Sequence, residues 1–177
     1  DNSLVVATDT QKNTTYILAQ RHDFKTGEEF AFIMARHFVS TYPDKVTSAK
    51  ISVVEHNWER VAGPDSRGQV RPHAHGFQLS GPGVKTCSVK VERDSRGDLA
   101  VTEGWSGCRD LTVLKTTQSS FTNFVRDQYT ALPEADDRLM GTAIEGRWDW
   151  SPALLRSVSA AAGKSRSGAP IDLDELN

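Results

Sequence analysis

Hydrophobic and polar positions follow a helical rhythm in the first quarter of the chain. Residues 8–21 and 27–42 are predicted to be helices, and the second has a clear apolar face made of Phe30, Ile33, Met34, His37, Phe38 and Tyr42. Glu28 and Glu29 occupy its first turn, where the helix dipole favours carboxylates. Pro43 is expected to end it, because proline disfavours a helical residue before it.

The first residues predict a short strand at 4–7 that leads into the first helix. Thr8, with Gln11 three residues later, fits a capping box, in which two side chains satisfy free backbone N–H groups. A Thr-rich turn is the alternative. The strand pattern begins almost at once and no Met opens the chain, so we expect this sequence to be a piece of a longer protein.

The middle of the chain alternates with the period of β-strands. Residues 50–61 are rich in strand-forming residues, with Ile51 and Val53 on one face. Residues 84–93 alternate cleanly, so that Cys87, Val89 and Val91 face one way and Thr86, Ser88, Lys90 and Glu92 face the other. Further strands are predicted at 99–103, 111–116 and about 139–150.

Turns and helix ends complete the predicted outline. The tetrapeptide Asp-Ser-Arg-Gly occurs at 65–68 and at 94–97, and both copies are expected to join antiparallel strands through a glycine turn. Ser119 can cap a helix whose buried stripe is Phe121, Phe124, Val125 and Tyr129. Ser151-Pro152 begins a short helix that Gly163 stops, and residues 164–177 are expected to form a mobile tail. The fold class is α+β, with helices on one face of an antiparallel sheet.

Composition narrows the class of protein. The chain has 177 residues, with 21 Lys and Arg against 23 Asp and Glu, so one nearly neutral domain or one domain with an appendage is expected. This balance argues against general nucleic-acid binding, and the longest apolar run, residues 30–35, is too short for a membrane span. Cys87 and Cys108 make neither a disulfide framework nor a zinc cage. His73 and His75 could share a strand face, but the sequence offers no third metal ligand.

Two longer segments carry a family resemblance. The first is residues 5–14 (VVATDTQKNT), and the second is residues 111–121 (LTVLKTTQSSF) with Phe124, Tyr129, Leu132 and Arg138 after it. Together with residues 58–60, 73–77 and 142–150 they resemble the urate oxidase (uricase) family, from about residue 2 to residue 150. The resemblance implies the tunnelling fold, an antiparallel sheet with two helices on one face. It divides the chain into a unit at 1–150, without its N-terminal strand region, and a divergent helix with an acidic tail at 151–177.

The resemblance also assigns a site. It implies that Phe121 stacks on a planar purine and that Arg138 grips a urate carbonyl and ring nitrogen with two N–H groups. It gives Thr8 a catalytic role at the oxygen site and in a proton relay, and Asp9 a hydrogen bond to the substrate through its backbone N–H. The Thr-Asp pair and the Phe/Arg pair of one site then come from different subunits. Lys12 and Lys115 are motif residues without an assigned role.

The implied reaction is oxidation of urate by O₂ and water to 5-hydroxyisourate and hydrogen peroxide. The resemblance implies no metal, flavin or other cofactor, urate and O₂ as partners, and a homotetramer that binds neither nucleic acid nor membranes. It implies an intracellular location, the peroxisome in a eukaryote or the cytoplasm in a bacterium, although the C-terminus lacks Ser-Lys-Leu.

Several readings remain open at this stage. A Lys upstream of Thr8, a clamp Gln, and an Asn and a His from a second unit cannot be placed, so we expect this chain alone to be inactive or very weak. One alternative is a catalytically inactive fragment acting as a tunnelling-fold subunit or purine-binding module, and another is pterin chemistry in the same fold. Locally, Phe121 could be a core residue, Arg138 a surface ion pair with Asp136 or Asp137, and Thr8 a helix cap.

Overall fold

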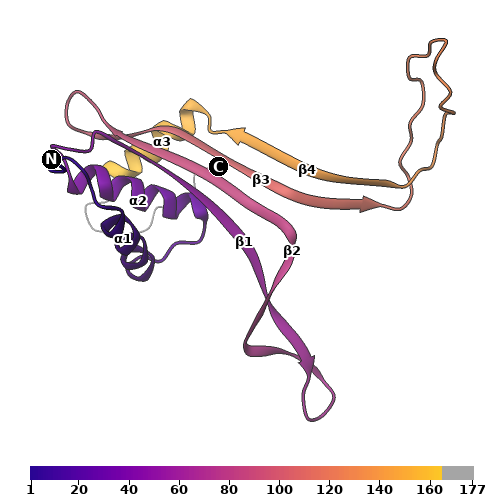
Figure 1. Ribbon diagram of the computed structural model, residues 1–177, viewed down its shortest axis with the longest axis horizontal. Coiled ribbons are helices and arrows are strands. Elements are labelled where there is room, and N and C mark those ends of the chain that lie inside the picture. Colours follow the sequence, from indigo (N-terminus) through magenta and orange to yellow (C-terminus); the bar gives the residue numbers. More distant parts are fainter. Residues whose placement is uncertain (165–177) are drawn as a thin grey trace. The chain divides into compact units, whose positions relative to one another are not determined.

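The computed structural model describes residues 1–164, and the predicted tail beyond them lies outside the described residues. Four strands form one sheet in the order β1-β2-β3-β4, so neighbours in sequence are neighbours in space and each runs antiparallel to the next (Figure 1). The α+β class is confirmed. The elements are α1 (Thr8–Arg21), α2 (Gly27–Thr41), β1 (Ser48–Pro64), β2 (Val70–Arg93), β3 (Leu99–Lys115), β4 (Met140–Asp149) and α3 (Pro152–Lys164).

By its contacts the chain divides into two compact units. The first comprises Asp1–His56, Lys85–Gly107 and the described residues from Arg147 onward, and it holds all three helices. The second comprises Asn57–Val84 and Cys108–Gly146. Each of the four strands contributes residues to both units.

The core of the first unit lies between the helices and one face of the sheet. Helix α2 is buried on two sides. Its deeper side packs on the sheet through Ala31, Phe32, Ala35 and Val39. The face predicted from helical spacing packs instead toward α1, where Met34 and Phe38 meet Leu18. Helix α3 joins the same core through Val158, Leu154 and Leu155, so three helices rather than two cover this face.

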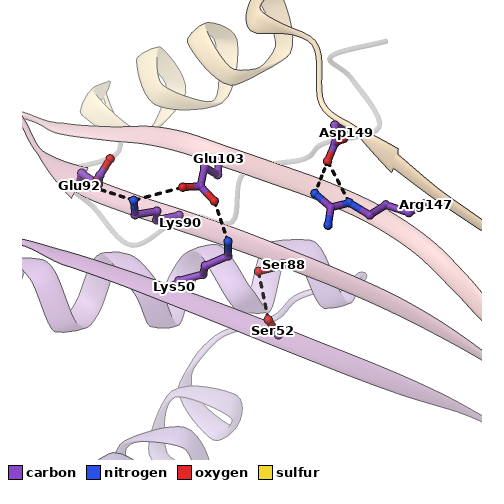
Figure 2. Close-up of polar contacts among 8 residues, drawn as sticks. All are labelled: Lys50, Ser52, Ser88, Lys90, Glu92, Glu103, Arg147 and Asp149. Carbon is purple, nitrogen blue, oxygen red and sulfur yellow. Dashed lines mark hydrogen bonds and ion pairs between the residues drawn. The ribbon is translucent and has the colours of Figure 1, made fainter.

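The predicted strand alternation is confirmed. Ile51, Val53, Cys87, Val89 and Val91 all contribute to the core. Their polar neighbours lie on the opposite face, as the period of two requires. There an ion-pair network joins β1, β2 and β3: Glu103 contacts Lys50 Nζ at 2.6 Å and Lys90 Nζ at 3.2 Å, and Lys90 also contacts Glu92 at 3.0 Å (Figure 2). Hydrogen bonds to these two carboxylates, first that to Glu92 and then that to Glu103, raise the pKa of Lys90.

Both Asp-Ser-Arg-Gly segments form glycine turns between neighbouring strands, as predicted, and the two turns share one geometry. In each, the Asp side chain accepts hydrogen bonds from the backbone N–H groups two and four residues later, at 2.8 and 3.0 Å in the first turn and 2.8 and 2.9 Å in the second. The glycines, Gly68 and Gly97, have φ of 74° and 89°, a conformation that other residues rarely adopt. In the first turn these bonds, that from Gln69 most of all, lower the pKa of Asp65.

Two local predictions at the start of the chain are wrong. Residues 4–7 form no strand; Val5 N–H closes a turn onto Asn2, and the Leu4 and Val5 side chains are exposed. Helix α1 has Ala7 as its N-cap with no side-chain cap, because the helix already includes Thr8; Gln11 donates to the Val6 carbonyl instead. Side-chain capping occurs at α2, where Thr26 accepts from Glu29 N–H.

Two further boundaries differ from the prediction. The strands predicted at 99–103 and 111–116 are parts of one strand, β3. Ser151 does cap α3, accepting from Leu154 N–H at 3.2 Å, but the helix includes Gly163 and continues to Lys164. The error in α3 arises because Gly163, expected to stop the helix, lies within it.

Replacing Gly104 with alanine is expected to destabilise the first unit. A Cβ at Gly104 would overlap the ring of Trp150, which is held in place because its N–H groups bond Gly104 O and Ser106 Oγ. The overlap is expected to lower the free energy of unfolding by about 1–3 kcal/mol, measured by urea titration at one protein concentration. The control is Gly63→Ala, where the new Cβ meets nothing within 4 Å. Equal effects of the two substitutions would contradict this packing argument.

The two cysteines are expected to differ sharply in reactivity. Cys87 is 3% exposed, and burial, with a smaller effect from the Glu28 carboxylate, raises its pKa to about 12. Because the thiolate is the nucleophile, Ellman's reagent at pH 8 should label only the half-buried Cys108 in the native chain and both thiols in denaturant. Cys108→Ser should abolish the fast reaction, whereas Cys87→Ser should leave it intact.

Candidate functional site

Residues 116–139, between β3 and β4, do not form the predicted helix. They form a long loop whose two arms run side by side. Phe121 and Ala135 form an antiparallel bridge, with N–H to carbonyl distances of 2.9 and 3.3 Å. Gln118 and Asn123 have φ of 59° and 56°, in the left-handed region that a helix cannot contain. Val125, expected on a buried stripe, is 95% exposed. The helical spacing of apolar residues here therefore does not reflect burial.

One carboxylate secures the base of this segment. Asp137 Oδ1 accepts hydrogen bonds from Thr117 Oγ1 at 3.0 Å and from Gln118 N–H at 2.7 Å. Arg138 N–H donates to the Ser119 carbonyl at 2.7 Å, and Lys115 Nζ donates to the Gln118 carbonyl. The bonds of Asp137 and Arg138 tie the two arms of the segment together where they leave the sheet. The Lys115 bond lies within the first arm and gives Lys115 a local structural role.

Phe121 and Arg138 are brought together by these two arms. The guanidinium carbon of Arg138 lies 5.7 Å from the centroid of the Phe121 ring, which is 45% exposed. In the part of the chain that the structure describes, the Arg138 guanidinium has no hydrogen-bond acceptor and no carboxylate partner, and Asp137 Oδ1 bonds Thr117 and Gln118 instead. An accessible aromatic face beside an unpaired guanidinium is suited to a flat anion.

Thr8 and Asp9 belong to the first unit and form the first turn of α1. Both are exposed. The first hydrogen bond within the helix runs from Gln11 N–H to Ala7 O, so the N–H groups of Thr8 and Asp9 have no intrahelical acceptor. The Asp9 carboxylate contacts Lys12 Nζ at 3.1 Å and accepts from Asn13 Nδ2 at 2.9 Å. The side chain of Asp9 is thus held by its own helix, while its N–H remains able to bind an anion.

The structure adds residues that the sequence analysis did not place at this site. Phe124, predicted to lie on a buried helical stripe, stacks on Phe121, and the Arg126 guanidinium lies over Phe124. Asp137 entered the prediction only as a possible ion-pair partner of Arg138. A usable signal was Asn123, since Asn tolerates the left-handed conformation and here separates two aromatic residues.

His73 and His75, the two histidines that could share a strand face, contact each other. His73 Nδ1 accepts a hydrogen bond from His75 N–H at 3.1 Å. Within residues 1–164, no three His, Cys, Asp or Glu side chains gather in a way that could hold a metal ion. Among the helices of the same residues, none is long and apolar enough to cross a membrane.

Comparison with known proteins identifies relatives along most of the chain. The uricase family model matches residues 1–90 and 105–167. Uricase-2 isozyme 1 of Glycine max is 46% identical over 159 residues, which is 89% of this chain and 48% of that protein. Uricase of Drosophila melanogaster is 34% identical over 171 residues, 85% of this chain and 47% of that protein. The chain spans about half the length of the curated relatives it matches. The predicted division at residue 150 stays a prediction.

Solved structures agree with these sequence matches. The uricase of Bacillus fastidious superposes with a TM-score of 0.75 at 26% identity, covering 99% of this chain and 52% of that one. The uricase of Arthrobacter globiformis gives a TM-score of 0.63 at 33% identity, covering 96% of this chain and 55% of that one. The expected fold is therefore confirmed, and with a family model that matches most of its residues, this chain belongs to the uricase family.

Proposed function

We propose that this chain forms part of a urate oxidase and binds urate between Phe121 and Arg138 of one copy and Thr8 and Asp9 of another. The observation that carries the proposal is the unpaired Arg138 guanidinium beside the half-exposed ring of Phe121. Urate is a planar anion with carbonyl and N–H groups on its edge. The ring of Phe121 can stack on the flat purine, and the guanidinium of Arg138 can pair with its negative charge.

Each residue has a definite task in this proposal. Phe121 stacks on the purine ring, and Arg138 donates two charge-assisted hydrogen bonds to a carbonyl and a ring nitrogen. The Asp9 N–H lies at the positive end of the α1 dipole and binds the far edge of the anion. Thr8, the residue before Asp9, contributes a hydroxyl that can pass a proton to or from bound oxygen.

The reaction proposed needs no cofactor. Urate is electron-rich and transfers two electrons to O₂, which becomes hydrogen peroxide, while water supplies the hydroxyl group of 5-hydroxyisourate. The protein then has only to hold the anion and O₂ together and to move protons. The compartment proposed is the peroxisome in a eukaryotic cell or the cytoplasm in a bacterium, and the assembly a homotetramer.

The proposed site predicts how a substitution changes binding of a urate analogue, 8-azaxanthine, measured by calorimetry. Arg138→Lys is expected to weaken binding about ten- to hundredfold, because an ammonium cannot make the paired bonds of a guanidinium. Arg109→Lys is the control, since Arg109 is also exposed but is paired with Asp110. The proposal fails if the native chain does not bind the analogue or if both substitutions weaken binding equally.

Turnover is followed separately by the loss of urate absorbance in the ultraviolet. We expect little or none from the purified chain, because the Lys, Gln, Asn and His that the family resemblance requires cannot be placed in it. Brisk turnover would show that those groups are unnecessary. Analogue binding without turnover is the result expected both of a part of a urate oxidase and of the alternative, a purine-binding module.

A second prediction tests whether the site is shared between copies. Asp9→Pro removes the proposed N–H donor at a position in the first helical turn, where proline is tolerated. Chains with Asp9→Pro or Arg138→Lys should each bind 8-azaxanthine weakly. Assembled together in equal amounts, they should regain about a quarter of the sites at native affinity, because one copy supplies Asp9 and the other Arg138.

Thr10→Pro is the matched control for the helix. It places proline one residue later in the same turn and removes a different N–H, so it should leave binding unchanged. A mixture of Asp9→Pro and Arg138→Lys chains that binds no better than its separate components would show that one copy supplies both pairs.

A further inference from the structure

The ring of Phe121 is supported from behind by a second ring. Phe124 lies parallel to it, with centroids 4.7 Å apart and planes inclined by 12°. At that distance two parallel rings are offset rather than fully eclipsed, which is the favoured arrangement for an aromatic pair. One face of Phe121 is therefore covered by Phe124, and a ligand can stack only on the other.

A bend at Asn123 lies between the two stacked rings, Phe121 and Phe124. Asn123 adopts a φ of 56°, and its N–H donates to Glu134 Oε1 of the opposite arm at 3.3 Å. The left-handed residue bends the chain, and Phe124 stacks on Phe121. A residue three positions along an extended chain could not otherwise contact the same ring.

Arg126 and Arg138 lie at different distances from the two stacked rings. The Arg126 guanidinium carbon lies 4.7 Å from the Phe124 centroid, well within the range of a cation–π contact. The corresponding distance from Arg138 to Phe121 is 5.7 Å, near the outer limit of that range. Arg126 thus stabilises the supporting ring, whereas Arg138 remains free to turn toward a ligand.

We propose that Phe124 is a positioning residue for purine binding, which fixes the plane of Phe121 and restricts the substrate to its open face. The inference rests on the proposed function, since it assumes that Phe121 stacks on the substrate. Phe121 is half-exposed and has no core around it, so its backbone pairing with Ala135 leaves the ring orientation to its contacts with Phe124 and Arg138. Phe124 does not touch the substrate.

The test measures 8-azaxanthine binding by calorimetry and follows the Phe121 ring by NMR of phenylalanine-labelled full-length chain. Phe124→Leu keeps an apolar side chain but removes the ring. It should shift the Phe121 ring signals downfield, as the ring current of Phe124 is lost, and weaken binding about three- to tenfold. Phe124→Tyr restores a ring and should bind within about twofold of the native chain.

Tyr129→Leu is the matched control, because Tyr129 is an 83% exposed ring in the same segment. It should change neither the Phe121 signals nor the affinity. If the native chain binds and Phe121→Leu weakens binding, but Phe124→Leu binds like the native chain, only the present inference is overturned. The same holds if Tyr129→Leu is as damaging as Phe124→Leu. If the native chain does not bind 8-azaxanthine at all, the proposed function falls and this inference with it.

Discussion

The short antiparallel pairing between Phe121 and Ala135 is the constraint on which the candidate site depends. It closes the segment between β3 and β4 into two adjacent arms, one carrying Phe121 and the other ending at Arg138. Residues that are seventeen positions apart in sequence thereby come into side-chain contact. In the predicted helix, Phe121 would have lain on a buried apolar stripe, where no ligand could stack on its ring.

Most of the first unit could be predicted from the sequence, because its elements each bury one face in a common core. Alternation at Val89 and Val91 and helical spacing at Met34 and Phe38 are direct consequences of that burial. The Asp-Ser-Arg-Gly turns were also predictable, since the Asp side chain and the glycine φ are local properties of four residues.

The second unit was harder to predict, because apolar spacing there does not report burial. Val125 and Tyr129 stand at helical positions but are exposed, and β2 begins at Val70, although Pro72, Gly76, Gly81 and Pro82 are untypical of a strand. Pattern alone would have placed Phe121 in the core. Its proposed role came from the family resemblance, and the contact with Arg138 required the long-range pairing that no local pattern reveals.

The exposure of Arg138 has a consequence for how a urate site must be built. A guanidinium in open water gains little from pairing with an anion, since water competes for both partners and salt screens their attraction. Strong binding therefore requires that water be excluded around the bound anion.

Phe121, backed by Phe124, can cover only one face of a flat ligand, so a further surface must cover the rest and satisfy its edge. The free N–H groups at the start of α1 are chemically suited to that task, and a second copy of the chain can bring them. The proposed sharing of the site between copies would meet this physical demand for desolvation, and the family resemblance implies the same arrangement.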